Sequence, residues 1–232
     1  MLAAARKPPI GAAPGKAAPV HYPDSDGLPM AENTVQYDWI VKLKENIDAL
    51  IPDFVAGDLF WYPVEGDNRT RVAPDVMVAI GRPKGPRSSY LQWDEDGIAP
   101  QVVFEVQSPG NTLREMYRKL NFYDRYGVSE YYVYNPDDRA LIVCLRVGDR
   151  LTEIPIESSF KSPLLGIEFR LGEDLEVYGP SGQPFLGAQE LFQQVQAERQ
   201  KAEAERQKAE AERQRAEALA AKLRALGIDP DA

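Results

Sequence analysis

The chain has 232 residues, of which 44% are hydrophobic, with one cysteine, one histidine and a formal net charge of −9. This size allows one sizeable core and an appendage. A lone cysteine excludes an internal disulfide and fits a reducing cytoplasm, and a lone histidine excludes a multi-histidine zinc site. No apolar run approaches the roughly 18 residues of a membrane span, so no membrane partner is expected, and the acidic balance predicts only modest affinity for nucleic acid.

The N-terminal part of the sequence divides into a segment without a core and a helix. Residues 1–27 are rich in Ala, Pro and Gly and are expected to be flexible. A helix is expected from Pro29 to Pro52, because apolar residues recur at helical spacing between Ile40 and Leu50. Glu32 falls near the inward side of this helix, which permits a role in a site. A first-turn acid stabilised by the helix dipole is the alternative.

Two apolar runs each carry an acid, PDVMV at 74–78 and VVFEVQSPG at 102–110. A carboxylate on a buried strand loses hydration, which destabilises the fold unless something compensates. Because side chains alternate faces along a strand, Glu105 and Gln107 project together, and Asp75 converges with Glu105 if the two strands are neighbours. A shared divalent cation would compensate both acids. Separate ion pairs with Lys or Arg are the alternative.

Residues 81–97, between the two runs, are too rich in Gly, Pro and charge to form a core element, so a long loop is expected. Its cations Arg82, Lys84 and Arg87 are candidates for contacts with nucleic-acid phosphates. Its aromatic residues are candidates for stacking on bases, or for holding the loop in place.

A second helix follows a turn at 108–112. Thr112 and Glu115 form the pattern of a capping box that opens a helix, and Gly127 ends it. Lys119 lies at the border of the apolar stripe of this helix. There its stem can pack while its ammonium group reaches toward the ends of the strands. A solvated helix lysine is the alternative.

The order of these motifs resembles the Uma-type endonuclease family, a branch of the PD-(D/E)XK restriction-endonuclease-like superfamily. The resemblance is carried by PDV at 74–76, EVQSP at 105–109 and a helix lysine eight residues before GVSEYYV at 127–133. It is densest over 72–136 and compatible over about 28–190. It implies an α/β fold, with a restriction-endonuclease-like core in which helices flank a central mixed β-sheet.

The resemblance also implies roles for individual residues. Asp75 matches the first metal-binding acid of the superfamily, and Glu105 matches the acid of the (D/E)XK element. Gln107 replaces the lysine of that element, whereas Lys119 matches the helix lysine that recurs in the Uma-type pattern. Glu32 matches the acid often contributed by the first core helix.

The implied function is that of an endonuclease that depends on Mg²⁺ or Mn²⁺ and hydrolyses phosphodiester bonds of nucleic acid, DNA above all, by a metal-activated water. Asp75, Glu105 and the carbonyl of Val106 would hold the ion. Lys119 would stabilise developing charge, and Gln107 would hold a water. The alternative is a catalytically degenerate nuclease fold that serves as a binding or assembly module. The missing lysine and the acidic charge favour that alternative.

The rest of the chain adds strands and then a long helix. Residues 140–156 predict a hairpin whose first strand contains Cys144 as a buried thiol, and the nuclease-like domain is expected to span 28–187. Three seven-residue repeats, AERQKAE, AERQKAE and AERQRAE, fill 197–217 and predict a charged helix over 188–232. Apolar positions seven apart permit a weak coiled coil and a homodimer. A solitary helix supported by charge pairs is the alternative.

Overall fold

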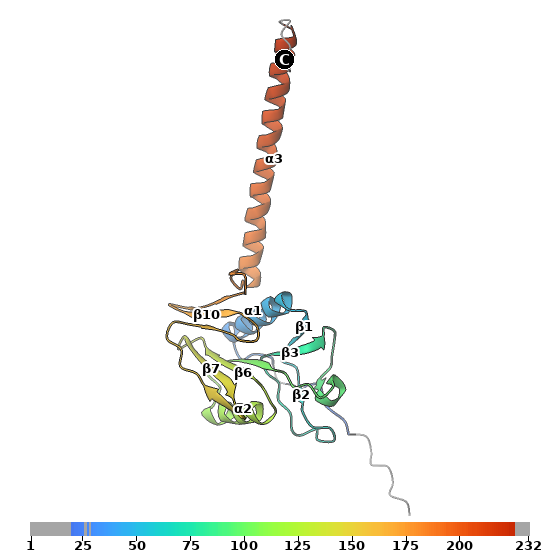
Figure 1. Ribbon diagram of the computed structural model, residues 1–232, viewed down its shortest axis with the longest axis vertical. Helices are drawn as coiled ribbons and strands as arrows, with labels where there is room; N and C mark the ends of the chain where they lie inside the picture. The colour runs from blue at the N-terminus through green and yellow to red at the C-terminus, as the bar shows by residue number, and fades with distance from the viewer. Residues whose placement is uncertain (1–19, 26, 28, 226–232) are drawn as a thin grey trace, which may run out of the picture.

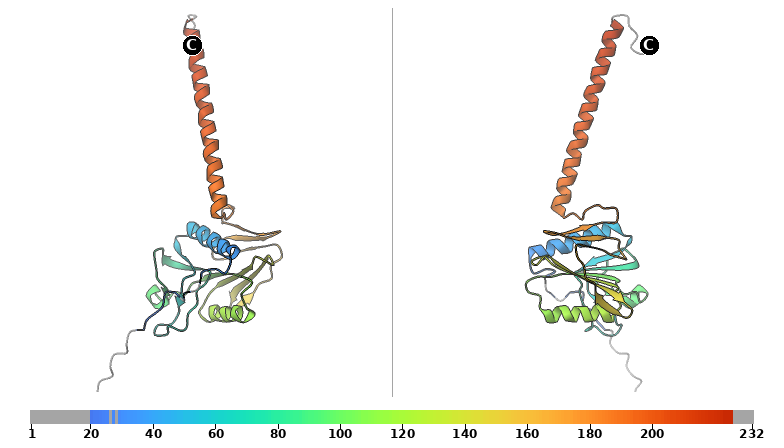
Figure 2. Two further views of the ribbon diagram at one scale, coloured as in Figure 1. Left: turned by 180° about the vertical axis from the view of Figure 1, so that it is seen from behind. Right: turned by 60° about the vertical axis from the view of Figure 1, so that its left-hand side comes forward.

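The computed structural model describes residues 20–25, 27 and 29–225. Most of the segment 1–27, which we expect to be flexible, lies outside the described residues, as does the end of the predicted C-terminal helix after residue 225. The described chain forms an α/β unit from which one long helix projects (Figures 1 and 2).

The centre of the unit is a six-stranded sheet in the order β1-β3-β5-β6-β7-β8. Its strands are β1 (Asp53–Gly57), β3 (Val76–Pro83), β5 (Val102–Val106), β6 (Glu130–Asn135), β7 (Ala140–Val147) and β8 (Arg150–Glu153). Within this sheet β5 and β6 pair in parallel and the other neighbours are antiparallel. The sheet is therefore mixed, which confirms the predicted fold class.

Helix α2 (Leu113–Arg125) connects the parallel strands β5 and β6. Parallel neighbours require a crossover of this kind, and it lays the helix across one face of the sheet. The Thr112 hydroxyl accepts a hydrogen bond from the backbone N–H of Glu115 at 3.2 Å, so the predicted N-cap is confirmed. Met116, Leu120 and Tyr123 of α2 belong to the hydrophobic cluster on this side of the sheet.

Helix α1 (Thr34–Leu50) packs on the opposite face of the sheet. Ile40, Leu43 and Ile47 are buried at helical spacing, as predicted. The helix is shorter than expected because Asn33 caps it, accepting a hydrogen bond from the backbone N–H of Gln36 at 2.8 Å. A small antiparallel sheet contributes to the same core, with strands β9 (Ser159–Lys161), β10 (Glu168–Leu171) and β11 (Leu175–Tyr178).

The loop expected at 81–97 is more ordered than its composition suggests. It contains the end of β3, a short strand β4 (Tyr90–Leu91) and a 3₁₀ helix η1 (Gln92–Glu95), and β4 pairs in parallel with β2 (Trp61–Tyr62). Burial of Tyr90 explains the order. Its ring lies in the α2-side cluster and its hydroxyl donates to the carbonyl of Ile98 at 2.9 Å.

Helix α3 (Ala188–Ala225) projects from the α1 side of the unit (Figure 2). Its base is joined to α1 by a 3.8 Å ion pair between Lys42 and Glu190 and by the Asn46 amide, which donates to the carbonyl of Leu186 at 2.9 Å. Its side chains are exposed almost throughout, an arrangement that fits both a solitary helix and a seam awaiting a partner. Of the helices in the described residues, none is long and apolar enough to span a bilayer.

Candidate active site

The two predicted acids lie opposite each other on neighbouring strands. β3 and β5 are antiparallel, with Val76 opposite Phe104. The same register, continued by one residue, places Asp75 opposite Glu105. Directly opposed side chains in an antiparallel pair share a face, with Cβ atoms about 4.5–5.5 Å apart. Asp75 Oδ2 also accepts a hydrogen bond from the backbone N–H of Val106 at 2.7 Å. Both acids therefore project toward α2 from the same end of the sheet.

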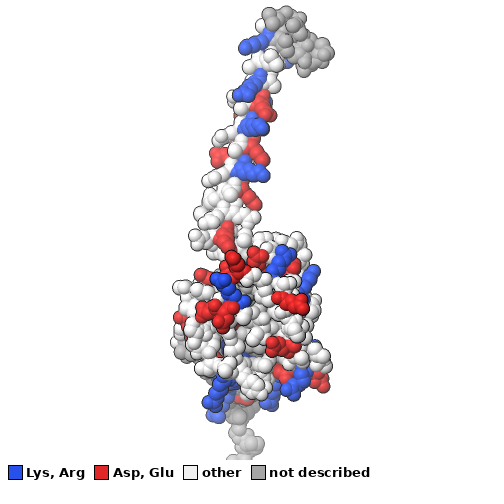
Figure 3. All heavy atoms as spheres, turned by 90° about the vertical axis from the view of Figure 1, so that its left-hand side faces the viewer, with Lys and Arg blue, Asp and Glu red and all other residues white. Residues whose placement is uncertain are grey.

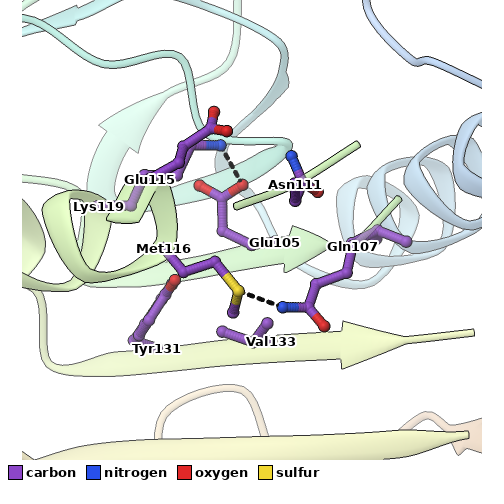
Figure 4. A pocket seen from close by; sticks show the side chains of 9 residues that line it. Glu105, Gln107, Asn111, Glu115, Met116, Lys119, Tyr131 and Val133 are labelled. Atoms are coloured by element: carbon purple, nitrogen blue, oxygen red, sulfur yellow. Dashed lines mark hydrogen bonds and ion pairs between the residues drawn. The ribbon is translucent and has the colours of Figure 1, made fainter. Parts of the chain in front are cut away.

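Two side chains of α2 hold the Glu105 carboxylate, which is only 6% exposed. Lys119 Nζ lies 2.6 Å from Glu105 Oε2, and the Tyr123 hydroxyl donates to Oε1. Figure 4 shows the Lys119 side chain reaching over Glu105 from the helix. The structure thus brings together Asp75, Glu105 and Lys119, the three residues on which the predicted site depends.

Burial and mutual charge set the protonation behaviour of this group. Burial, followed by the negative charge of Glu105, raises the pKa of Asp75 well above its usual value. For Lys119, burial acts to lower the pKa, but the charges of Glu105 and Asp75 outweigh it, and the net pKa is raised. Burial and Glu105 also raise the pKa of Tyr123. Lys119 therefore stays cationic at neutral pH, and Tyr123 stays a neutral donor.

Asp75 and Lys119 border a cavity of about 730 Å³. Further acidic and amide side chains in its wall are Glu32, Gln36, Asp58, Asn111 and Glu115. Arg69, Arg71 and Arg118 contribute positive charge, and Phe60 and Phe122 contribute apolar surface. The cavity therefore combines carboxylates with guanidinium groups able to meet an anionic substrate.

Glu32 reaches this cavity from the segment that precedes α1. Its carboxylate accepts a hydrogen bond from the Ser108 hydroxyl, and its backbone N–H donates to Gln36 Oε1 at 2.9 Å. Gln36 Nε2 in turn donates to the carbonyl of Val106 at 2.8 Å. The expected position of Glu32 on the first helix is wrong, because Asn33 caps that helix and Thr34 is its first residue, but the side chain still lines the cavity.

Gln107 is directed away from the Glu105 carboxylate. Its amide contacts the sulfur of Met116, as Figure 4 shows. A small space of about 10 Å³ remains beside Glu105, Gln107 and Met116, about enough for one water. Gln107 therefore occupies the sequence position of the expected lysine, but its side chain is not directed to the Glu105 carboxylate, which Lys119 contacts.

The three cations predicted to contact phosphates do not border the cavity. Arg82 and Arg87 both form ion pairs with Glu95, and Lys84 Nζ lies 2.9 Å from Asp48 Oδ1. Their charges are matched within the protein.

Sequence reasoning missed several side chains of the site. Tyr123 stands at an apolar position of the predicted second helix, although a tyrosine on a face that also carries Lys119 signals a buried hydrogen bond. Arg69 and Arg71 lie in a polar turn that gives no local sign of facing Asp75. Gln36 had no signal beyond being a polar residue on the inward face of α1.

The residues present fit a divalent cation. Mg²⁺ is commonly bound by one or two carboxylates, with water and substrate oxygens completing the shell. Asp75 and Glu105 supply such a pair, and the raised pKa of Asp75 reflects burial and a like charge that a cation would offset. Within the described residues, no cluster of three or more His, Cys, Asp or Glu side chains is arranged to hold a metal by itself.

The chain was compared with protein families, curated proteins and solved structures. The sequence model of the Uma2 family, described as "Putative restriction endonuclease", matches residues 31–173. No curated protein matches the chain. Among solved structures, the chain is similar to a crystal structure described as a "putative nuclease belonging to DUF820 from Anabaena variabilis ATCC 29413", with a TM-score of 0.38 and 15% identity over 63% of this chain and 68% of that chain. Since the family match covers more than half of the 232 residues, the chain belongs to the Uma2 family of restriction-endonuclease-like proteins.

Proposed function

We propose that this protein is a divalent-metal-dependent endonuclease that hydrolyses phosphodiester bonds of nucleic acid, with DNA as the main substrate. The observation that carries the proposal is the placement of Asp75 opposite Glu105, with Lys119 2.6 Å from the Glu105 carboxylate, beside a cavity of about 730 Å³. Membership of a family described as "Putative restriction endonuclease" supports the same reaction class.

Asp75 and Glu105 are the proposed ligands of the ion, either Mg²⁺ or Mn²⁺. When bound there, the ion would polarise a phosphoryl oxygen and lower the pKa of a bound water. The Val106 carbonyl is the proposed third ligand. Its oxygen accepts a hydrogen bond from Gln36 and has a second lone pair for a cation.

Lys119 takes the role that the resemblance assigns to the lysine of the (D/E)XK element. Because it stays cationic at neutral pH, it stabilises negative charge that develops on the phosphate. Tyr123 positions Glu105 through its hydrogen bond to Oε1. Glu32 is the proposed additional acid of the site, since it borders the cavity and is fixed by Ser108. Gln107 is proposed to hold a water in the small space beside Glu105.

Nicking and linearisation of supercoiled plasmid DNA test the proposal. The full chain is expected to cleave in the presence of Mg²⁺ or Mn²⁺ and to be inactive in EDTA. Asp75→Ala and Lys119→Met are expected to abolish cleavage. Asp38→Ala, which removes an exposed aspartate of α1, serves as the matched control and should keep full activity.

Metal binding is measured separately from cleavage by thermal unfolding. Mn²⁺ is expected to raise the midpoint of the wild-type protein and to leave Asp75→Ala unchanged, since a ligand that binds the folded state stabilises it. Equal cleavage by the wild type and Asp75→Ala would indicate a contaminating nuclease. If Mn²⁺ leaves the unfolding midpoint of the wild type unchanged and no cleavage occurs, a degenerate fold that acts as a binding or assembly module is favoured.

A further inference from the structure

The outer face of α2 carries positive charge that extends beyond the candidate active site. Exposed side chains recur along this face at helical spacing: Arg114, Tyr117, Arg118, Asn121 and Arg125. At about 100° per residue, the three arginines fall within about 40° of one another around the helix axis. Among the described residues none of the three forms a salt bridge with an acid, although the Arg125 guanidinium lies 5.5 Å from the centre of the Tyr126 ring.

The acids of α2 do not neutralise these arginines. Asp124 accepts a hydrogen bond from the backbone N–H of Leu151 at 2.7 Å and pairs with Arg146 and Arg150 at 3.5 and 3.1 Å. Glu115 faces the cavity. The outer face of α2 is therefore a positively charged strip.

The strip is unusual in a protein with a formal net charge of −9. Figure 3 shows several blue Lys and Arg side chains at the end of the unit that lies away from α3, where Figure 1 places α2, whereas blue and red side chains are mixed on the rest of the face in view. A local cluster of positive charge gives an anionic polymer a preferred place of approach.

The strip is continuous with the candidate active site. Arg118 belongs to both, because it lies on the outer face of α2 and also borders the cavity. Arg69 and Arg71 line the same cavity from another segment. The Arg71 guanidinium is held 4.8 Å from the centre of the Phe60 ring, and its Nη1 donates to the carbonyl of Asn68 at 2.7 Å. Positive charge therefore runs from α2 to the cavity that contains Asp75.

We propose that the outer face of α2 binds the sugar–phosphate backbone of nucleic acid and leads it into the cavity. From Arg114 to Arg125 the strip extends about 16 Å along the helix, a length over which one strand of a duplex carries about five phosphates. Tyr117, with 68% of its surface exposed, lies beside the arginines and can stack on an unpaired base. The inference rests on the proposed nuclease function for its substrate, but not on cleavage.

The test is the salt dependence of binding, measured by fluorescence anisotropy with a labelled DNA duplex and an RNA duplex of the same sequence, in EDTA so that metal-dependent cleavage cannot occur. The variant combines Arg114→Gln, Arg118→Gln and Arg125→Gln. Each lost phosphate contact lowers the slope of log affinity against log salt by about 0.9, so the slope should fall by about 2 to 3. The matched control combines Arg199→Gln, Arg206→Gln and Arg215→Gln on α3, which changes the net charge equally at exposed positions elsewhere.

The two proposals fail in different ways. A reduced slope in the α2 variant alone, on DNA or RNA, supports the strip even if no cleavage is ever observed. The strip proposal is overturned by an unchanged slope, by an equal change in the α3 control, or by no binding of either duplex to the wild type. Plasmid cleavage is a separate measurement and does not depend on these outcomes. Circular dichroism verifies that the variant, in which only exposed side chains change, keeps its fold.

Discussion

Two buried glutamates on neighbouring strands show how differently one residue type can be used. Glu105 on β5 and Glu130 on β6 are 6% and 2% exposed. Glu130 accepts hydrogen bonds from the hydroxyls of Tyr132 and Ser162, at 2.7 and 2.6 Å, and from the backbone N–H of Leu164 at 2.7 Å. All of its partners are neutral, and they fasten the sheet to the segment after β9.

Glu105 has a neutral donor in Tyr123 but also a cation, Lys119, and a second carboxylate, Asp75, across the strand pair. Burial of a carboxylate therefore does not identify a site by itself. A second acid, a matching cation and an adjoining cavity distinguish Glu105, because such a cluster keeps an electrostatic conflict that a bound cation and substrate would resolve. Glu130 keeps none.

The largest expected effect on stability is that of Lys119→Met. It leaves Glu105 buried without its cation, and loss of one partner of a buried pair lowers the free energy of unfolding by about 3–5 kcal/mol. Urea unfolding in EDTA measures this loss. The control is Lys44→Met, which removes a partly exposed pair with Asp48 at 3.2 Å and should cost less than about 1 kcal/mol. Equal losses would mean that the Glu105 cluster is no more than an ordinary surface pair.

A smaller loss is expected from Glu130→Gln. The amide keeps one acceptor oxygen where the carboxylate has two, so part of the hydrogen bonding to Tyr132, Ser162 and Leu164 is lost. The free energy of unfolding should fall by about 1–3 kcal/mol. Plasmid cleavage below the unfolding temperature should be unchanged, whereas Glu105→Gln should abolish it. Loss of cleavage in folded Glu130→Gln would contradict the separation of the two clusters.

Asp75→Asn is expected to act in the opposite direction on stability. Burial and Glu105 disfavour the charged form of Asp75, so the neutral amide should stabilise the metal-free protein by about 0.5–2 kcal/mol while it abolishes cleavage. Asp38→Asn, at an exposed position, is the control and should change neither the stability nor the cleavage rate. A destabilised Asp75→Asn protein would show that the carboxylate is needed for folding.

The same substitution has a signature in pH. Because the pKa of Asp75 is raised in the folded state, the folded protein binds the proton more tightly than the unfolded chain does. Wild-type stability in EDTA should therefore fall, relative to Asp75→Asn, as the pH rises from the ordinary aspartate pKa to the raised value. Urea unfolding at a series of pH values measures the difference. Saturating Mg²⁺ should reduce it, since a cation compensates the ionised acid.

The smallest effect is expected from Gln107→Lys, which restores the sequence pattern of the (D/E)XK element. The side chain at 107 is directed toward Met116, and Lys119 already occupies Glu105 Oε2. The cleavage rate should therefore change by only a few fold. The kinetic comparison uses Gln107→Met, a neutral side chain of similar length, and a large gain specific to lysine would show that Lys119 does not replace the missing residue.

The core elements could be predicted because their signals are local. Strand alternation placed Asp75 and Glu105 on a shared face, and helical periodicity placed Lys119 beside the inward side of α2. The start of α1 near Glu32 was misplaced because the expected helix began at Pro29, whereas the hydrogen bond from the Gln36 backbone N–H to the Asn33 side chain caps the helix at Asn33.

Long-range charge pairing could not be predicted in the same way. The sequence indicates Arg82, Lys84 and Arg87 as candidates for phosphate contacts, but the structure pairs them with Glu95 and Asp48. The pairing with Asp48 joins segments 36 residues apart in the chain, so it depends on how β1 and β3 pair. Arg69 and Arg71 face the cavity for an equally non-local reason.

Because Cys144 is buried, its reactivity reports local opening of the protein core around it. Its side chain lies on the same side of the sheet as Met77 and Tyr123, and burial raises the pKa of the thiol to about 11. A thiol-specific dye should therefore react slowly with the native chain, whose sequence contains no second cysteine to confuse the signal. The labelling rate then measures how often the core between α2 and the sheet opens locally. A ligand that stabilises the cluster around Glu105 should lower this rate.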